Sequence, residues 1–560
     1  MALPKVDAVV IGLGVAGGTA AYVLTQAGKQ VVGLEAGPWR NQADFLRYYD
    51  ELMAYPYFNP FAEEKNNHEI PTWRPDADTE VGPPPVGPIV MDNHVGGTHH
   101  WTGQSWRYRV DDFKIRSSTV EHYGEEALPA GTSIADWPVT YEELEPYYEK
   151  VETVYGVSGD GGTNPFESPR VNDYPMPGLR RSGLGEWAYD GLSSFGFNPF
   201  TSPAGINSMD YNGRPGCSYC GYCTGHGCWN DSKLGTHVTA IPAAMETGLL
   251  EVRPNSRVTR ITTNDQGQAT GVIYVDENGD EQEQPAGIVI VATYVYENYR
   301  LLRLSDSDYF ADGIGNNAGN LGKWYMVHSY GGGYGYFPGQ NFNVFSGTGA
   351  QSIAFDDLNG DNFDHTDLGF IRGAICNVSM AESTPIGRSS LLPPGHAGWG
   401  ADYKKFLKED SQAIISIFTQ LEVLPYDANF IDLDPTAKDP LGMPIPRLTI
   451  SLYDNENLAN AYINAKLEEA LKSMGASMTW SWPPANIPIN SHAYGGTRMG
   501  DDPATSVTNK YGQVHESQNL IVLGGSNWPS TTGYNPTQSI YAHSWFAADY
   551  IAQNFDSIAL

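Results

Sequence analysis

The sequence predicts a mixed α/β (α+β) fold in which a Rossmann-like dinucleotide-binding unit is combined with a second domain. A glycine fingerprint near the N-terminus lies between an apolar strand and a helix. Strand-like segments return between residues 250 and 292 and resemble the second half of a nucleotide-binding sheet. A chain of 560 residues also exceeds what one hydrophobic core usually serves. We therefore expect two or three domains, or one large composite enzyme.

The fingerprint follows the apolar strand Val6–Ile11 and begins a helix that ends near Gly28. A second strand, Gln30–Leu34, is followed by Glu35, whose carboxylate would accept hydrogen bonds from ribose hydroxyls. The motif is G-x-G-x-x-G, formed by Gly12, Gly14 and Gly17. The first glycine permits a tight turn, the second lets the backbone approach a pyrophosphate, and the third lets helix and strand pack closely. This context predicts dinucleotide binding.

The charge balance excludes two classes of partner. Lys and Arg number 33 against 65 Asp and Glu, so the formal net charge is −32. Nucleic acids and anionic lipids both require clustered cations, so we expect neither. Hydrophobic residues make up 41% of the chain, which is too many for a disordered acidic protein. The acidity suits solubility, a cationic partner or a salty habitat.

No segment predicts a membrane span or a leader. No apolar run reaches the roughly 18–20 residues that cross a bilayer, so we expect no direct membrane insertion. The opening MALPKVDAVVIG lacks a basic region, an apolar core and a cleavage site, so no secretory signal is expected in this chain. The protein is then either cytoplasmic or exported by another route.

The remaining pattern predicts several further elements. Residues 136–154 predict a helix that begins with a capping box of Thr140 and Glu143, whereas residues 160–235 resemble a long loop. Residues 330–480 mix glycine-rich loops and strands in a separate substrate-facing domain. The other predicted elements are strands at Leu250–Ile261, Ala269–Asp276 and Gly287–Ala292, and helices at Asp454–Met474 and Thr537–Asn554.

Three distant stretches resemble the glucose–methanol–choline (GMC) oxidoreductase family. They are the N-terminal fingerprint, VGGTHHWTGQSW at 95–106, and SHAYGGTRMGDDPATSV at 491–507 with NLIVLGGSNWPSTTGYNPTQSIYAHSWFAADYIA at 519–552. Two further stretches, DWPVTYEELEPYYEKVETVYGVSG and CSYCGYCTGHGC, are similar to the flavoprotein subunits of bacterial gluconate 2-dehydrogenases, fructose dehydrogenases and FAD-dependent glucose dehydrogenases.

The resemblance implies a split Rossmann-like FAD-binding domain and a substrate domain with an antiparallel sheet backed by helices. The FAD-binding domain would comprise residues 1–45, 85–130, 235–328 and 486–560, and the substrate domain residues 330–485. A cluster loop would occupy residues 205–232, with excursions at 46–84 and 131–204.

The resemblance also implies a catalytic pair beside the flavin. One group removes the hydroxyl proton while hydride leaves the same carbon for flavin N5, and the other holds the substrate oxygen. His492 matches the first position and Asn535 the second. Asparagine cannot act as a base at neutral pH, so His492 would carry the proton alone. We expect His328 and His543 to be structural.

Further FAD contacts follow from the same resemblance. They are Glu35, Ala36, Gly96, Gly97, His100, Trp101, Thr102, Gly103, Val258, Ala292, Gly524, Gly525 and Thr537. Some members of the family attach FAD covalently through a histidine near His99 and His100, but non-covalent FAD is the expectation here. Many members carry Asp-Gly where this chain has Gly524-Gly525, which removes one polar contact.

Four of the five cysteines fall within twelve residues as C-x2-C-x2-C-x4-C: Cys217, Cys220, Cys223 and Cys228. Such runs are typical of iron–sulfur clusters, because each thiolate must reach one corner of a compact cube. Structural zinc and disulfides are the alternatives, although zinc usually separates its cysteine pairs by a longer loop. The resemblance implies a [3Fe–4S] cluster held by three of the four. Cys376 is expected to be an ordinary buried thiol.

The predicted activity is oxidation of a hydroxyl of a sugar, sugar acid or polyol. Electrons would leave one at a time through the cluster to a cytochrome c subunit or a similar acceptor. The related subunits travel with a small subunit that carries an export signal. This implies a periplasmic, membrane-associated enzyme, with a cytoplasmic one as the alternative.

Two other functions stay open. One is an oxygen-using oxidase with a zinc-stapled loop, and the other is an FAD-binding electron-transfer subunit without its own substrate. The sequence does not identify the substrate. A carboxylated substrate would require a cation in the pocket, for which Arg388, Lys404 and Arg447 are candidates by position alone.

Overall fold

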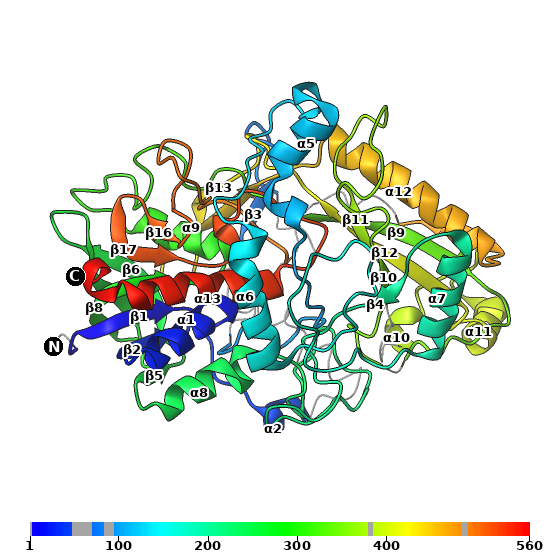
Figure 1. Ribbon diagram of the computed structural model, residues 1–560, viewed down its shortest axis with the longest axis horizontal. Coiled ribbons are helices and arrows are strands. Elements are labelled where there is room, and N and C mark those ends of the chain that lie inside the picture. The colour runs from blue at the N-terminus through cyan, green and yellow to red at the C-terminus, as the bar shows by residue number, and fades with distance from the viewer. Residues whose placement is uncertain (1–2, 47–69, 83–93, 346, 379–384, 483–490) are drawn as a thin grey trace.

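The computed structural model describes residues 3–46, 70–82, 94–345, 347–378, 385–482 and 491–560. Parts of several predicted segments lie outside the described residues: 47–69 and 83–84 of the first excursion, 85–93 and 486–490 of the FAD-binding segments, and 346, 379–384 and 483–485 of the substrate domain. Two sheets lie side by side along the longest axis of the molecule, and both chain ends lie beside the first of them (Figure 1).

The first sheet has eight strands. Its main order is β16-β17-β8-β1-β2-β5, and β7 joins β8 to β6. The pairs β1–β2, β1–β8, β17–β8 and β2–β5 are parallel, as a Rossmann-like sheet requires. The strands are β1 (Val6–Ile11), β2 (Val31–Leu34), β5 (Leu250–Arg253), β6 (Arg257–Thr263), β7 (Ala269–Val275), β8 (Glu281–Val291), β16 (Gln513–Val514) and β17 (Ser517–Val522).

Strand β1 is buried on both faces, which explains its unbroken apolar sequence. Ala8 and Val10 pack in one core with helices α1 (Val15–Gln26), α8 (Ala240–Glu246) and α13 (Thr537–Gln553). Val9 and Ile11 pack in a second core with α9 (Val295–Leu304). Successive side chains point to opposite faces of a strand, so this sheet has helices on both sides. The predicted N-terminal strand, helix and strand are confirmed.

The predicted strand Leu250–Ile261 is wrong, because the chain forms two strands there. Strand β5 continues the parallel sheet beside β2, whereas β6 turns away and pairs antiparallel with β7. The break falls at Pro254–Asn255, where proline has no N–H for a ladder and Asn255 has a positive φ of 51°.

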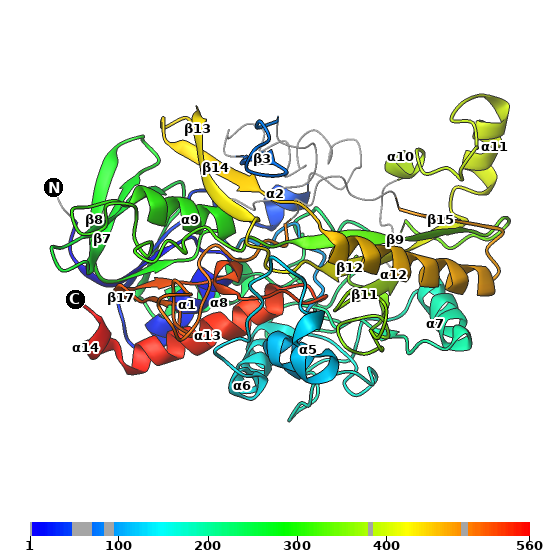
Figure 2. The ribbon, with the colours of Figure 1, turned by 90° about the horizontal axis from the view of Figure 1, so that it is seen from above.

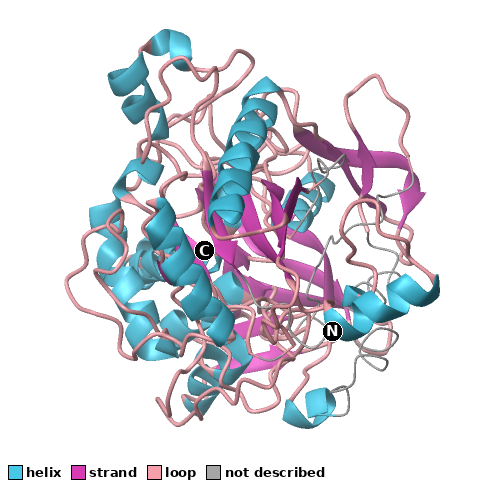
Figure 3. Cartoon of the chain, turned by 90° about the vertical axis from the view of Figure 1, so that its right-hand side faces the viewer, coloured by secondary structure: helices cyan, strands magenta, loops and turns pink. Residues whose placement is uncertain are grey.

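The second sheet has six antiparallel strands in the order β15-β9-β12-β11-β10-β4. They are β4 (Phe200–Thr201), β9 (His328–Tyr336), β10 (Ile353–Phe355), β11 (Ala374–Val378), β12 (Ile414–Glu422) and β15 (Met478–Ser481). Helices α7 (Gly183–Phe195) and α12 (Asp454–Ser473) pack on it through a shared apolar core (Figure 3). The predicted antiparallel sheet backed by helices is confirmed, and β4 joins it from outside residues 330–485.

Strand β9 has two different faces. A Cβ on Gly331 or Gly333 would meet side chains of α12, namely Asn460, Leu467 and Leu471, so these glycines let the helix lie close to the strand. The alternate residues His328, Tyr330 and Tyr334 therefore lie on the opposite face. We call this face of β9, β12 and β15 the open face of the second sheet.

The loop predicted over residues 160–235 is wrong in part, because it contains the 13-residue helix α7. The helix begins where the hydroxyl of Ser182 accepts a hydrogen bond from the amide of Gly185, and it ends at Gly196 in the left-handed region. These are ordinary helix start and stop signals, which the many prolines and glycines around them obscured.

A third, small sheet packs against the first. It consists of β3 (Thr72–Arg74), β13 (Phe430–Lys438) and β14 (Pro444–Thr449) in the order β13-β14-β3 (Figure 2). Ile431 and Leu448 are buried in the same core as Val9 of β1. Two strands from residues 330–485 therefore pack against the first sheet rather than the second.

The remaining helices surround these sheets. Helix α6 (Tyr141–Val151) begins with the predicted capping box of Thr140 and Glu143, and a π-turn, η3 (Glu152–Gly156), continues it. The others are α2 (Gln42–Leu46), α5 (Ile115–Tyr123), α10 (Pro385–Arg388), α11 (Gly400–Glu409), α14 (Phe555–Ile558), η1 (Val110–Phe113), η2 (Glu125–Ala127), η4 (Thr236–Val238) and η5 (Gly525–Asn527). Among the residues described, no helix combines the length and the apolar character that crossing a bilayer would demand.

Candidate active site

Five glycines from two distant segments form a backbone cradle at the carboxyl end of β1: Gly12, Gly14, Gly17, Gly96 and Gly97. A Cβ on Gly17 would lie 1.8 Å from the carbonyl oxygen of Gly12, so α1 can start here only with glycine at this position. A Cβ on Gly97, whose φ is +58°, would lie 2.7 Å from Cα of Gly14. Ala292 closes the cradle, because its carbonyl would lie 2.6 Å from a Cβ on Gly12. The structure thus brings six predicted cofactor residues together.

The cradle fits a pyrophosphate. Helix α1 begins in it, and the described residues provide neither a side-chain cap nor an acidic residue in its first turn. The N-cap residue of the helix, Gly14, has no side chain that could accept a hydrogen bond from the first amide groups. These N–H groups therefore point their dipoles at the cradle. Bare glycine backbone and a helix N-terminus together suit a phosphate group.

Glu35 braces this turn. Its carboxylate accepts hydrogen bonds from the amides of Leu13 (2.9 Å) and Gly37 (3.1 Å). Its carbonyl accepts from the amide of Ser256 at 2.8 Å, which holds the start of β6, and with it Val258, against the end of β2. Ala36 is exposed beside them. The predicted contacts with ribose and adenine stay predictions, but their residues share one edge of the sheet.

The segment His100–Gly103 lies against the predicted cluster loop at residues 205–232, which we call the cysteine loop, and against the two residues that follow Ser232. The indole N–H of Trp101 donates to the carbonyl of Leu234 at 3.0 Å, and the ammonium of Lys233 donates to the carbonyls of Trp101 and Cys223, both at 2.9 Å. The amide of Gly225 donates to the carbonyl of His100 at 2.7 Å. The predicted cluster loop and the predicted flavin segment are therefore neighbours.

The four clustered thiols differ in their surroundings. Cys223 is buried and its Sγ lies 3.8 Å from the carbonyl oxygen of Thr102, whereas Cys220 is exposed. Burial is the main cause that raises the pKa of Cys217 to about 11, and the nearby thiols of Cys228 and Cys220 contribute to this rise, so the three sulfurs lie close enough to interact electrostatically. Even so, no three His, Cys, Asp or Glu side chains in the described part of the chain form a group that could hold a metal ion.

The C-terminal motif residues follow strand β17. Gly524 has a φ of +109°, and a Cβ on Gly525 would lie 2.8 Å from the carbonyl of Ala493, the residue after His492. Gly525 accepts a hydrogen bond from the amide of Gly495 at 3.1 Å. Thr537 begins helix α13, again without a side-chain cap. The end of β17 thus connects the first sheet with the two predicted catalytic residues.

His492 is held by two residues of β9. Its Nδ1 lies 2.9 Å from Nδ1 of His328 and 3.2 Å from the hydroxyl of Tyr330. Burial lowers the pKa of His492 well below 6.5, and the nearby His328 lowers it further. A histidine with a lowered pKa stays neutral at physiological pH, and only a neutral imidazole can accept a proton.

Asn535 is buried and its amide is oriented by two neighbours. Its Oδ1 accepts hydrogen bonds from the indole of Trp106 and from the amide nitrogen of Gln420, both at 2.9 Å. Its Nδ2 donates one hydrogen to Oε1 of Gln420 at 3.2 Å. Because the oxygen receives two donors, the amide cannot flip without losing them, and Nδ2 retains a second N–H. That N–H can polarise a substrate oxygen.

The register of the second sheet brings His492 and Asn535 to one place. Tyr330 of β9 is directly opposite Gln420 of β12 in the ladder. Side chains of directly opposed residues lie on the same face with Cβ atoms about 5 Å apart. Tyr330 contacts His492 and Gln420 contacts Asn535, so this pair of opposed residues brings the two predicted catalytic residues to the same face of the sheet.

A row of half-buried aromatic side chains extends along the open face from Tyr330: Tyr330, Phe418, Trp482, Tyr334 and Trp480. Adjacent ring centroids are 5.1–5.6 Å apart, and both Trp480 and Trp482 stack on Tyr334. The buried indole N–H of Trp482 makes no hydrogen bond within the described part of the chain. This row offers ring faces and one polar donor beside His492.

Residues 201–329 and 425–544 match the N- and C-terminal family models of the GMC oxidoreductases. The chain is 31% identical to the gluconate 2-dehydrogenase flavoprotein of Pantoea cypripedii, over 99% of this chain and 94% of that protein. The chain belongs to the GMC oxidoreductase family. It is also 30% identical to a 2-methyl-1,2-propanediol dehydrogenase of Mycolicibacterium austroafricanum, over 99% and 96% of the two chains.

A solved structure of a formate oxidase variant from Aspergillus oryzae superposes with a TM-score of 0.62 at 16% identity, and the match covers 100% of both chains. The predicted family and fold class are confirmed. As a GMC protein this chain is an FAD-dependent oxidoreductase, and the glycine cradle and the bare start of α1 fit that cofactor.

Of the three predicted carboxylate-binding cations in this GMC oxidoreductase, only Arg388 lies by the open face. Arg447 is paired with Asp432 on the third sheet at 2.7 Å, and Lys404 is exposed on α11. Arg388 donates to the carbonyl of Ile414 at 2.6 Å and interacts electrostatically with Tyr334. Its Nε is buried without a hydrogen-bond partner in the described residues, and burial lowers the pKa of this guanidinium to about 10.

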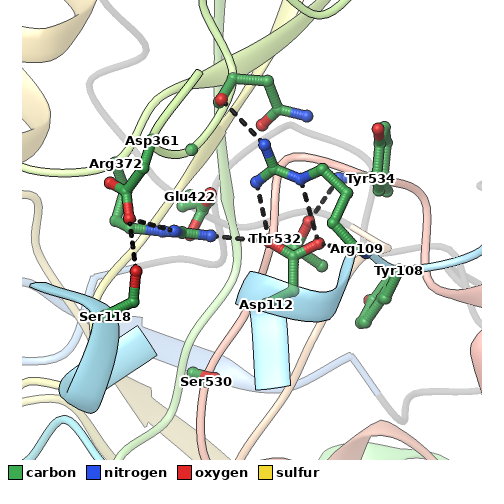
Figure 4. Close-up of polar contacts among 12 residues, drawn as sticks. Tyr108, Arg109, Asp112, Ser118, Asp361, Arg372, Glu422, Ser530, Thr532 and Tyr534 are labelled. Carbon is green, nitrogen blue, oxygen red and sulfur yellow. Dashed lines mark hydrogen bonds and ion pairs between the residues drawn. The ribbon is translucent and has the colours of Figure 1, made fainter. Parts of the chain in front are cut away.

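A buried charge network behind the site holds the loop that carries Asn535 (Figure 4). Asp112 pairs with Arg109 at 2.8 Å and with Arg372 at 2.7 Å, and Arg372 also donates to Glu422 at 2.9 Å. Arg109 in turn lies over the ring of Tyr534, 5.8 Å from its centroid. Burial raises the pKa of Glu422 to about 7 despite the opposing effect of Arg372. The network therefore holds Tyr534, the residue that precedes Asn535.

Several site residues escaped the sequence analysis. Tyr330, Gln420 and Glu422 carry no local motif, and only the β9–β12 register places them together. His328 was expected to be structural, yet it contacts the predicted base directly. A period-two pattern of polar and aromatic residues within each of these two strands is the one signal that could have indicated a shared face.

Proposed function

We propose that this GMC oxidoreductase is a dehydrogenase that oxidises a hydroxyl group of a sugar, sugar acid or polyol. The observation that carries the proposal is the convergence of a neutral histidine and an oriented amide on one sheet face, through Tyr330 and Gln420. FAD, when bound in the glycine cradle, supplies flavin N5 as the hydride acceptor. We propose that it is held without a covalent bond by the residues named above.

The side chains of His492 and Asn535 would act on different atoms of the substrate hydroxyl. His492 takes the hydroxyl proton as hydride leaves the same carbon, because its pKa keeps it neutral. Asn535 donates its remaining N–H to the substrate oxygen, where negative charge develops as the proton leaves. The hydrogen bonds from Trp106 and Gln420 fix that N–H in place before the substrate arrives.

The aromatic row supports a polyhydroxylated substrate. A sugar or polyol has apolar C–H faces that pack on rings, and hydroxyl groups that require polar partners. Tyr334 and Trp482 provide such rings, and the indole N–H of Trp482 provides a donor. The buried Nε of Arg388 favours a substrate with a carboxylate, because a guanidinium binds such a group through paired N–H donors. The gluconate 2-dehydrogenase relative agrees with that choice.

We propose that electrons leave through the cysteine loop. Four thiols within twelve residues suit an iron–sulfur cluster, and Cys223 lies against Thr102 of the predicted flavin segment. The described side chains do not form a three-ligand metal group, so the geometry does not by itself supply the site. A [3Fe–4S] cluster, a cytochrome c acceptor, a small exported partner subunit and a periplasmic location accordingly stay part of this proposal.

One anaerobic experiment tests the activity. The purified FAD-loaded protein is mixed with D-gluconate, D-glucose, D-fructose, a polyol or 2-methyl-1,2-propanediol, and the flavin absorbance is followed. Bleaching by a sugar, sugar acid or polyol supports the proposal. Bleaching by none of these compounds would favour a non-catalytic electron-transfer subunit. Rapid reoxidation by oxygen with stoichiometric peroxide would favour an oxidase.

A second experiment tests the cysteine loop separately. Iron, acid-labile sulfide and zinc are measured on protein purified without oxygen, and an EPR spectrum is recorded. Iron with sulfide that is lost in a Cys217→Ser, Cys223→Ser double variant supports the cluster, and Cys376→Ser serves as the matched control because this buried thiol lies on β11. Zinc without iron would overturn it.

A further inference from the structure

The ring of His328 is fully buried, and its two nitrogens face different partners. Nε2 lies 2.6 Å from the carbonyl oxygen of Thr532, and Nδ1 lies 2.9 Å from Nδ1 of His492. A carbonyl oxygen can only accept a hydrogen bond, so Nε2 of His328 must carry a hydrogen. The Thr532 carbonyl therefore decides where the proton of His328 sits.

The position of this hydrogen on His328 determines which nitrogen of His492 carries a hydrogen. Burial lowers the pKa of His328 to about 4, so this imidazole is neutral near pH 7 and has one N–H. With the hydrogen on Nε2, Nδ1 of His328 bears a lone pair. Two lone pairs would repel each other at 2.9 Å, so Nδ1 of His492 must donate. A neutral His492 then has its lone pair on Nε2.

We propose that His328 is a positioning residue that fixes the tautomer of His492, so that Nε2 of His492 is the nitrogen that accepts the substrate proton. The proposal rests on the proposed function for the role of His492, but the tautomer itself can be measured without any substrate. His328 needs no contact with substrate, and it acts through the Thr532–His328–His492 chain.

Two tyrosines also make polar contacts with these nitrogens. The Tyr330 hydroxyl lies 3.2 Å from Nδ1 of His492 and can accept a share of the same hydrogen. If Tyr330 donated to Nδ1 instead, the two histidine Nδ1 lone pairs would face each other. The Tyr494 hydroxyl lies 3.3 Å from Nε2 of His328, which is longer than the contact to Thr532. Glu422 is opposite His328 in the strand pair and is the nearest acidic position in the ladder.

The first test reads the tautomer directly. The full-length FAD-loaded protein is labelled with 15N-histidine, and long-range 1H–15N correlations are recorded between pH 6 and 8. His492→Asn identifies the His492 signals by their loss. We expect the Nδ1–H form of His492 in the wild type and in His328→Asn, whose Oδ1 can accept in place of Nδ1. In His328→Leu we expect the Nε2–H form or a mixture of both.

The second test links the tautomer to chemistry. Anaerobic flavin reduction is measured with whichever alcohol of the panel bleaches the wild type, and FAD content and thermal stability are recorded for each variant. We expect His328→Leu to lower the reduction rate constant about 100-fold with substrate affinity little changed, and His328→Asn to restore most of it. Tyr330→Phe should keep the wild-type tautomer.

Two outcomes would overturn the inference. One is an Nε2–H form of His492 in the wild type, and the other is an unchanged Nδ1–H form in His328→Leu. Failure of every alcohol to bleach the flavin would count against the proposed function alone, since the NMR result does not depend on turnover. If His328→Leu does not fold, the wild-type and His328→Asn spectra still decide the assignment.

Discussion

The cofactor cradle and the proposed catalytic face, which is the open face of the second sheet with His492 and Asn535, are built in opposite ways. The cradle consists of backbone: a side-chain atom on Gly17 or Gly97 would collide with Gly12 or Gly14, so its shape depends on what these residues lack. The catalytic face consists of side chains, in which His492 and Asn535 are each held by partners on the second sheet. The first region requires glycines at short fixed spacings within each of two segments, and the second requires a cross-strand register between Tyr330 and Gln420, which are 90 positions apart.

The largest expected effect is at the base. His492→Asn removes the proton acceptor, so we expect flavin reduction to slow by about 10³-fold or more while FAD binding is retained. Stopped-flow absorbance measures the rate. His543→Asn is the matched control, because His543 is also buried with a pKa lowered to about 4, but it lies on α13 and contacts the carbonyl of Lys510, away from the open face. Equal losses in both variants would contradict the assignment.

A smaller effect is expected at the amide. Asn535→Asp keeps the shape and the acceptors for Trp106 and Gln420 but presents no N–H to the substrate oxygen. We expect kcat/KM to fall about 100-fold, mainly through kcat, because the lost contact strengthens as charge develops. A change confined to KM would show that Asn535 binds substrate without stabilising the reacting oxygen.

A substitution in the cradle should weaken FAD binding rather than slow flavin reduction. Gly97→Ala brings a Cβ to 2.7 Å from Cα of Gly14, so we expect at least a tenfold weaker FAD affinity, which is about 1.4 kcal/mol. Gly28→Ala is the control, since Gly28 also has a positive φ, of +79°, but nothing lies within 4 Å of its Cβ. Fluorescence titration of apoprotein measures the affinity. The comparison fails if both variants bind FAD equally well.

The smallest effect is expected in the pH dependence of the flavin reduction rate. Because the folded pKa of His492 lies well below 6.5, the histidine keeps its neutral form as the pH falls to that value. The flavin reduction rate should therefore change less than about twofold between pH 8 and 6.5, and decline only below that range. A decline centred at or above pH 6.5 would contradict the lowered pKa.

The same contrast explains what the sequence could predict. The β1–α1–β2 unit, the cradle glycines and the capping box of Thr140 depend on local spacing, and each of them lies where the pattern indicated. The break at Pro254 and the helix α7 were missed because glycine and proline are typical both of loops and of the ends of strands and helices. The roles of His328 and Gln420 depend on which strands become neighbours, and no local pattern contains that information.

A crystal structure of the reduced FAD-loaded enzyme with the alcohol that bleaches it tests the central claim most directly. The account predicts that the reacting hydroxyl oxygen lies about 3 Å from both Nε2 of His492 and Nδ2 of Asn535, with the substrate carbon chain along Tyr334 and Trp482. A hydroxyl bound away from either of the two groups would contradict it.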